Sequence, residues 1–112
     1  MNAGGSSTGA AICAASGIAP INLGSDGGGS IRIPASFCGV YGFKPSFGRI
    51  PFYPQANNDF ISHHGPITRT VTDGAYMLMA MIGPDDRDPT SLFYDQEDYL
   101  KKLDNGISEL KV

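Results

Sequence analysis

The sequence predicts a mixed α/β chain, because segments with helical and with strand character follow one another along it. An alanine-rich stretch at residues 8–16 follows two serines and ends at Gly17, which favours a helix capped by serine and closed by glycine. The short apolar run at residues 18–23 is typical of a buried strand. Residues 70–73 run from threonine to aspartate, as in a capping box that opens a helix.

The middle of the chain is rich in turn-forming residues. Residues 24–30 contain four glycines and predict a loop, and residues 31–37 predict a short helix directly after it. Residues 39–54 alternate aromatic residues with glycine and proline, which indicates short extended pieces joined by turns.

The helix that begins at Thr70 is expected to end at Gly83 and Pro84. Its apolar face consists of Met77, Leu78, Met81 and Ile82. The methionines here, including Met79, are interpreted as packing side chains and not as ligands of a cofactor. Beyond this helix we expect a polar turn at 85–89, a short helix at 98–103 and the first residues of a strand at 110–112.

Bulk charge and composition exclude several classes of partner. The 112 residues carry a net charge of -3 and 41% hydrophobic residues, with a pI near 5.1, so nothing indicates binding to nucleic acid or to an anionic membrane. No apolar run is long enough to span a bilayer. Cys13 and Cys38 fit no metal-ligand spacing and are interpreted as buried small hydrophobes in the reducing cytoplasm.

Ser30 is the strongest candidate for a catalytic side chain. It follows three glycines, whose unhindered amides can converge on the oxyanion formed when a hydroxyl attacks a carbonyl. A helix that starts just after Ser30 adds its positive end to the same place. An ordinary glycine turn explains this loop alone equally well.

A second, upstream segment removes that ambiguity, because the two segments together resemble a known signature. The matching stretches, in order, are Gly4-Gly5-Ser6-Ser7-Thr8-Gly9, residues 24–39, Gly42-Phe43-Lys44-Pro45-Ser46-Phe47-Gly48-Arg49, residues 65–71 and Arg87-Asp88-Pro89. In this pattern the chain resembles the amidase-signature family over nearly its whole length. The resemblance implies an α/β fold with a mixed sheet flanked by helices, of which residues 1–112 form a partial domain.

The resemblance assigns a role to each polar residue of the two segments. Ser30 becomes the acylated nucleophile, and Ser6 becomes the bridging serine, entered through a cis peptide bond from Gly5. The expected oxyanion-hole amides are those of Gly27, Gly28, Gly29 and Ser30. Residues expected to hold the loop and the serines in place are Ser7, Ser25, Asp26 and Arg32.

The family also requires a neutral lysine, which draws the nucleophile's proton through the bridging serine. Such a lysine needs a pKa several units below its usual value of about 10.4. The family places it well upstream of the glycine-serine segments, and no lysine precedes Ser6 here. Lys44 matches no catalytic position, and Lys101, Lys102 and Lys111 are expected to be solvated surface charges.

Two other site chemistries are weighed against this one. A serine-protease-like triad would join Ser30 to His64 and Asp26. His63 and His64 point to opposite faces of a strand and therefore cannot share one metal ion. A phosphate-binding loop would need a lysine after its second glycine, and the segment that ends at Gly9 is followed by alanines.

The function implied is hydrolysis of a carboxamide through an acyl-serine intermediate, with no metal and no organic cofactor. Two alternatives are the glutaminase subunit of a tRNA-dependent amidotransferase and a truncated, catalytically inactive polypeptide. Ile33 stands where such glutaminase subunits usually have glutamine, which favours a stand-alone amidase. The expected partner is a small-molecule amide, without direct nucleic-acid or membrane partners. A homo-oligomer of the full-length protein is left open.

Overall fold

The computed structural model describes residues 2–54, 60–94 and 97–108. Its centre is a sheet with the strand order β1-β3-β2, formed by β1 (Ile21–Asp26), β3 (His63–Thr68) and β2 (Tyr41–Gly42). Both pairings are antiparallel, and Gly24 of β1 lies opposite Gly65 of β3. The α/β class is confirmed for the described residues, while the three strands described there pair only antiparallel and do not form the mixed sheet that the resemblance implied.

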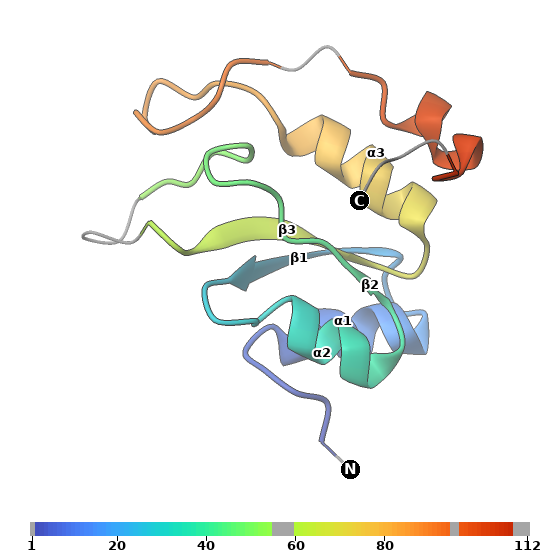
Figure 1. The fold of residues 1–112 in the computed structure, drawn as a ribbon. Helices are drawn as coiled ribbons and strands as arrows, with labels where there is room; N and C mark the ends of the chain where they lie inside the picture. Colours follow the sequence, from blue (N-terminus) through green and yellow to red (C-terminus); the bar gives the residue numbers. More distant parts are fainter. Residues whose placement is uncertain (1, 55–59, 95–96, 109–112) are drawn as a thin grey trace.

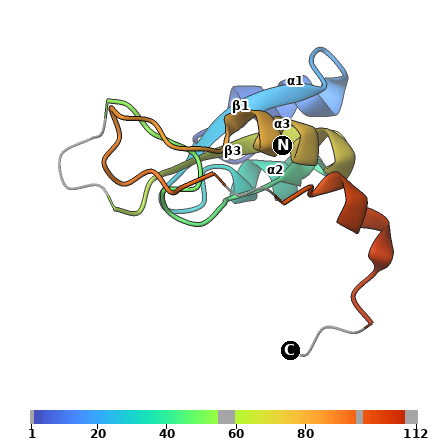
Figure 2. The same cartoon turned by 90° about the horizontal axis from the view of Figure 1, so that it is seen from above.

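Helices cover the two faces of this sheet (Figure 1). The helices α1 (Thr8–Ser16) and α2 (Arg32–Cys38) lie together on one face, and α3 (Val71–Met81) lies on the other. The 3-10 helix η1 (Leu100–Asn105) packs near α3, and Figure 2 shows it at the side of the molecule, beyond the end of that helix.

Each face of the sheet has its own hydrophobic cluster. Under α1 and α2 the buried members are Ala11, Ala14, Ile31 and Ile67. Small alanines let α1 approach the sheet closely, so that Ile31 and Ile67 fill the space between them. On the α3 side the buried members are Ile50, Leu78 and Ile82, with Phe43, Met81 and Tyr99 packed against them.

The predicted helices are found close to their expected positions. Gly17 ends α1 in the left-handed conformation at φ 76°, as a closing glycine should. The Thr70 hydroxyl accepts a hydrogen bond from the Asp73 amide at 3.0 Å and so caps α3. Helix α3 stops before Gly83 and Pro84 as predicted. The strand predicted at 110–112 lies outside the described residues.

The strand prediction at residues 18–23 was wrong in position and in burial. The strand is Ile21–Asp26, so Gly24, Ser25 and Asp26 belong to it and not to the loop. Ile18 is 75% exposed and Leu23 is 52% exposed. A Cβ at Gly24 would lie 2.8 Å from both Ile31 and Ile67, so this glycine serves close packing within a strand and not the predicted turn.

The two cysteines are half-buried, which corrects the prediction that they are buried. Both thiols are free, and Cys38 contacts the Ala3 carbonyl through its sulfur at 3.9 Å.

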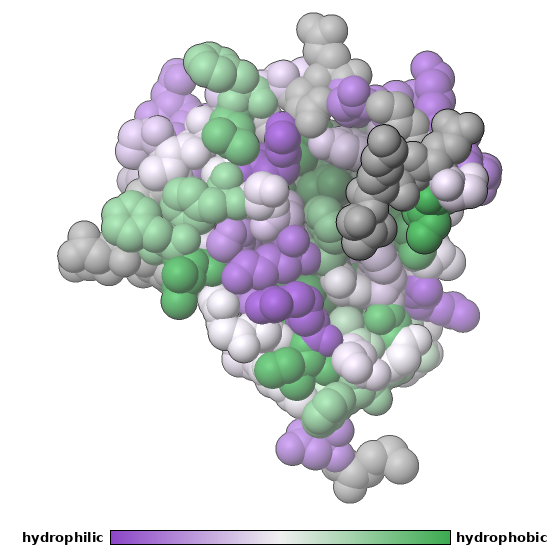
Figure 3. All heavy atoms as spheres, viewed as in Figure 1, coloured by the Kyte–Doolittle hydropathy of each residue, from purple (hydrophilic) through white to green (hydrophobic). Residues whose placement is uncertain are grey.

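Large apolar side chains also remain at the surface of the described part. Figure 3 shows hydrophobic residues exposed on the face viewed in Figure 1, including the region of α1 and α2 at the bottom. Exposed members on these helices are Ile12, Ile33 and Phe37. None of the helices in the described ranges has the length and apolar character that crossing a bilayer demands.

Candidate active site

The loop that carries Ser30 joins the end of β1 to the start of α2 and is organised by Asp26. The Asp26 carboxylate, fully buried, accepts hydrogen bonds from the amides of Gly29 at 2.7 Å and Ile31 at 3.1 Å. It also accepts one from the Arg32 amide at 3.2 Å. The carboxylate therefore fixes the Gly28–Gly29 peptide before Ser30 and the Ser30–Ile31 peptide after it.

Two cations neutralise the buried Asp26 carboxylate. The Arg32 guanidinium donates through Nε and Nη2, each at 2.9 Å, in a two-point contact. The Lys44 ammonium lies 3.8 Å from Oδ1. The hydrogen bonds from Arg32 hold the pKa of the Asp26 carboxyl well below its usual range, against the opposing effect of burial. Asp26 is thus a charged anchor at neutral pH.

The segment that carries Ser6 lies against the Ser30 loop. The amide of Ser7 donates to the carbonyl of Ser30 at 3.1 Å, which ties the two segments together by their backbones. The Ser7 hydroxyl accepts from the Ser25 amide at 3.1 Å and donates to the Ser25 carbonyl at 3.2 Å. The Gly5–Ser6 peptide bond is cis, as the family resemblance implied.

These contacts correct one expectation about Ser7. It stands at the N-cap position of α1, but its side chain makes no capping hydrogen bond. The hydroxyl is instead engaged by the backbone of β1, because the strand edge at Ser25 offers both a donor and an acceptor.

Ser6 is exposed and borders an open depression of about 370 Å³. The lining residues come from the start of α1, from β1 and from β3, and they are Ser6, Ser7, Gly9, Ala10, Leu23, Gly24, Ser25 and His64. Ser30 is not among these lining residues, but a depression of this size beside Ser6 offers room for a small-molecule group.

The amides expected to form the oxyanion hole are not equivalent. The Gly29 amide is used by the Asp26 carboxylate, so it faces the buried anchor. The amides of Gly27, Gly28 and Ser30 make no such bond to Asp26. The set of candidate donors to an oxyanion therefore narrows from four amides to these three.

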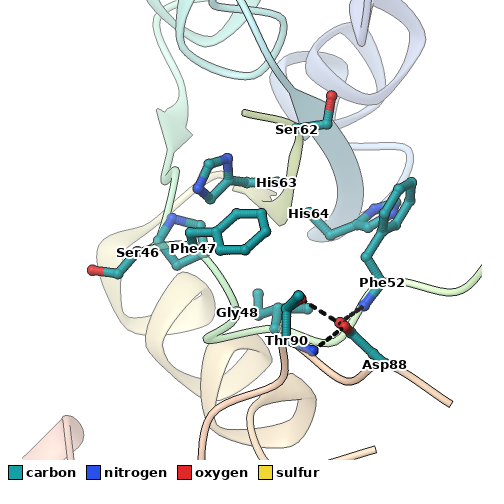
Figure 4. A pocket seen from close by; sticks show the side chains of 11 residues that line it. Ser46, Phe47, Gly48, Phe52, Ser62, His63, His64, Asp88 and Thr90 are labelled. Atoms are coloured by element: carbon teal, nitrogen blue, oxygen red, sulfur yellow. Dashed lines mark hydrogen bonds between the residues drawn. The ribbon is translucent and has the colours of Figure 1, made fainter. Parts of the chain in front are cut away.

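The histidines lie on β3 beside aromatic rings (Figure 4). The ring of His63 packs edge-on against Phe47 at 5.6 Å between centroids, and the ring of His64 packs against Phe52 at 4.4 Å. His64 Nδ1 is buried and has no hydrogen-bond partner among the described residues, and burial lowers the pKa of this histidine. The adjoining cavity of about 10 Å³ has the size of a single water.

Ser30, His64 and Asp26 do not form a relay. The carboxylate of Asp26 is saturated by Arg32 and by loop amides, and its described partners include no histidine. In the described ranges no three histidine, cysteine or acidic side chains gather as metal ligands would.

Sequence reasoning missed the place of Lys44. Its ammonium donates to the carbonyls of Gly27 and Ile61, each at 3.2 Å, and so reaches the loop before Ser30. No local pattern signals this contact, because the three residues come from separate segments. The other lysine whose ammonium contact is described, Lys101, lies 3.3 Å from the Asp98 carboxylate.

The cis peptide bond before Ser6 and the glycine-serine loop tied to that segment are features of an amidase-signature hydrolase, and here both lie against an antiparallel sheet. Comparison with known proteins agrees. The Amidase family matches residues 1–112, and the chain belongs to this family.

The individual relatives include both kinds of enzyme that the sequence suggests. The glutamyl-tRNA(Gln) amidotransferase A subunit of Bacillus velezensis is 50% identical over 110 residues, which cover 97% of this chain and 23% of that protein. An acylamidase of Rhodococcus erythropolis is 46% identical over 112 residues, covering 99% of this chain and 24% of that protein. The chain thus spans about a quarter of the length of these curated relatives.

Solved structures give the same picture. A bacterial aryl acylamidase of the amidase-signature family superposes with a TM-score of 0.84 and 48% identity, covering 95% of this chain and 22% of that chain. The peptide amidase of Stenotrophomonas maltophilia superposes with a TM-score of 0.77 and 34% identity, covering 92% and 22%. The fold of the described residues is therefore that of a segment of these enzymes.

Proposed function

We propose that this chain is the nucleophile-bearing part of an amide hydrolase, in which Ser30 is acylated and Ser6 relays its proton. The observation that carries the proposal is the backbone hydrogen bond from the Ser7 amide to the Ser30 carbonyl, which ties the segment of Ser6 to the segment of Ser30. Ser6 itself borders the open depression.

In the proposed reaction, Ser30 Oγ attacks the carbonyl carbon of a carboxamide and forms a new C–O bond. The π electrons move to the carbonyl oxygen, where the amides of Gly27, Gly28 and Ser30 stabilise the negative charge. The Ser30 proton passes through the Ser6 hydroxyl to a base and is returned to the departing nitrogen as the C–N bond breaks. Water then cleaves acyl-Ser30 and gives the carboxylic acid and the free serine.

The base is proposed to be a lysine, and neither lysine with a described ammonium contact, Lys44 or Lys101, is placed for that role. Lys44 is turned toward the carbonyls of Gly27 and Ile61, and Lys101 pairs with Asp98. We therefore expect the 112 residues alone to show negligible amidase activity. Turnover of a simple amide by the purified chain, abolished by Ser30→Ala, would contradict this.

Two substrate classes fit this proposal: the amides cleaved by a stand-alone amidase and the glutamine amide cleaved by an amidotransferase glutaminase. Ile33 supports the stand-alone amidase, and the relatives of the two kinds are similarly identical to this chain, 50% over 110 aligned residues and 46% over 112. We also propose that the protein is located in the cytoplasm, which the free thiols of Cys13 and Cys38 support.

The direct test is covalent labelling of the whole protein that contains this segment with a fluorophosphonate. Intact-mass and peptide mass spectrometry should place one adduct on the peptide with Ser30. Ser30→Ala should remove the adduct, and Ser36→Ala, an exposed serine of α2, should keep it. An adduct that persists in Ser30→Ala would overturn the proposed nucleophile.

A further inference from the structure

Lys44 follows β2 in sequence, and its ammonium reaches the glycine loop at the Gly27 carbonyl. Its side chain is only 18% exposed, although lysines are mostly solvated. The ammonium has three N–H donors, and its surroundings provide three acceptors: the carbonyls of Gly27 and Ile61 and, at 3.8 Å, Asp26 Oδ1. Lys44 is therefore a largely buried side chain that binds the glycine loop, and not a solvated surface charge.

The contact with the Gly27 carbonyl fixes the direction of the next amide. The Gly27–Gly28 peptide is not among the cis bonds of the described chain, so its carbonyl and its N–H point in opposite directions across one plane. Because the carbonyl is held by Lys44, the N–H of Gly28 is directed away from the lysine. Asp26 sets the following peptide in the same way by accepting from Gly29.

We propose that Lys44 is a positioning residue for amide hydrolysis, which orients the Gly28 N–H as a donor to the oxyanion that forms on the carbonyl carbon of the substrate. The inference rests on the proposed role of Ser30. Lys44 touches no reacting atom and acts only through the Gly27–Gly28 peptide.

The three consecutive glycines explain why the Gly27–Gly28 peptide needs a hydrogen bond to hold its orientation. Glycine populates both signs of φ with little cost, so this peptide plane is free to turn over when nothing holds its carbonyl. A turned-over peptide would present a carbonyl oxygen to the developing oxyanion and remove one donor. This loss is felt in the transition state more than in substrate binding, so kcat should fall while KM changes little.

The test compares lysine variants in the whole protein with an amide substrate. Lys44→Met should lower kcat by about tenfold to a hundredfold, somewhat less than the direct loss of an oxyanion donor, with KM within about twofold. Lys44→Arg, which keeps a cation and several donors, should have a kcat between those of Lys44→Met and the wild type. Lys101→Met removes an exposed lysine that pairs with Asp98 and should leave both constants unchanged.

The outcomes separate this inference from the proposed function. Wild-type kcat in a folded Lys44→Met variant, with Ser30→Ala inactive, would overturn the role of Lys44 and leave Ser30 as the nucleophile. Full activity of Ser30→Ala would instead overturn the proposed function. If Lys44→Met does not fold by circular dichroism, Lys44→Gln, which keeps a donor without the charge, takes its place. A folded Lys44→Gln with wild-type kcat would count against the role of the ammonium.

Discussion

The carboxylate of Asp26 and the guanidinium of Arg32 meet in a two-point contact of 2.9 Å on each side, next to the loop that carries Ser30. The pair is asymmetric, since the Asp26 side chain is fully buried and the Arg32 side chain is 54% exposed. Removing the carboxylate would therefore leave three loop amides and a half-solvated cation without their acceptor.

Asp26→Asn should destabilise the protein by about 2 kcal/mol or more, because charged hydrogen bonds to a buried carboxylate are lost. The carboxyl pKa is lower in the folded than in the unfolded chain, where it is about 3.9. The ionised carboxylate thus contributes stability above about pH 4, and this contribution is lost as the pH falls toward the folded pKa.

Urea unfolding between pH 7 and pH 2.5 measures this effect. The wild type should lose more stability over this range than Asp26→Asn does. Asp86→Asn, which changes an exposed aspartate, should follow the wild type. Parallel curves for the wild type and Asp26→Asn would show that Asp26 is no charged anchor.

Ser6→Ala should slow acylation in the whole protein by at least about a hundredfold, within the range of general acid–base contributions, because the proton relay is broken. Binding of the substrate should stay largely intact, so KM should change little. His64→Ala is the matched control, since His64 lines the same depression as Ser6, and it should keep most of the activity. A folded but inactive His64→Ala would bring back the histidine triad.

His64 should make the fold weaker in mild acid. Burial lowers its pKa below the value of about 6.5 expected in the unfolded chain, so the unfolded state binds a proton that the folded state does not. Stability is therefore complete above about pH 6.5 and falls as the pH drops toward the folded pKa. His64→Gln, which does not titrate, should lose less stability between pH 7 and pH 5 in thermal unfolding; an unchanged pH slope would refute the effect.

Thr70→Ala should cost about 1 kcal/mol of stability, because its hydroxyl caps α3 through the Asp73 amide. Thr72→Ala, at an exposed position in the first turn of the same helix, should cost far less. Chemical unfolding of both variants distinguishes a true cap from a general effect of threonine. Equal losses at the two positions would argue against the cap.

Gly48→Ala should be more destabilising than Gly106→Ala, although both glycines have a left-handed φ, of 74° and 69°. Backbone strain of about 1–3 kcal/mol applies to both, and Gly106, with ψ -172°, lies in a region that glycine alone normally adopts. Only at Gly48 would the new Cβ lie 2.2 Å from the Thr90 carbonyl, while at Gly106 nothing lies within 4 Å. A shift of the unfolding midpoint that is equal in the two variants would mean that the loop at Gly48 does not pack on Thr90.

Local sequence patterns were sufficient for the helices and for the family. The alanine-rich run closed by Gly17 and the threonine cap of α3 are decided by residues within one or two helical turns, so their pattern can be read without the fold. The paired glycine-serine segments identified the family by their order along the chain, and the match to Amidase over residues 1–112 agrees with that identification.

The sequence by itself determined which residues are available to the site: Ser6, Ser30, the glycines before Ser30, and the ion pair of Asp26 and Arg32 that holds their loop. The tertiary structure alone decided that Gly24 lies in a strand, that Ser7 binds Ser25 and that Lys44 clamps the Gly27 carbonyl. The physical reason is that each of these depends on a backbone partner from a distant segment. A glycine that permits a turn and a glycine that permits close packing have the same side chain, and only the neighbour across the sheet tells them apart.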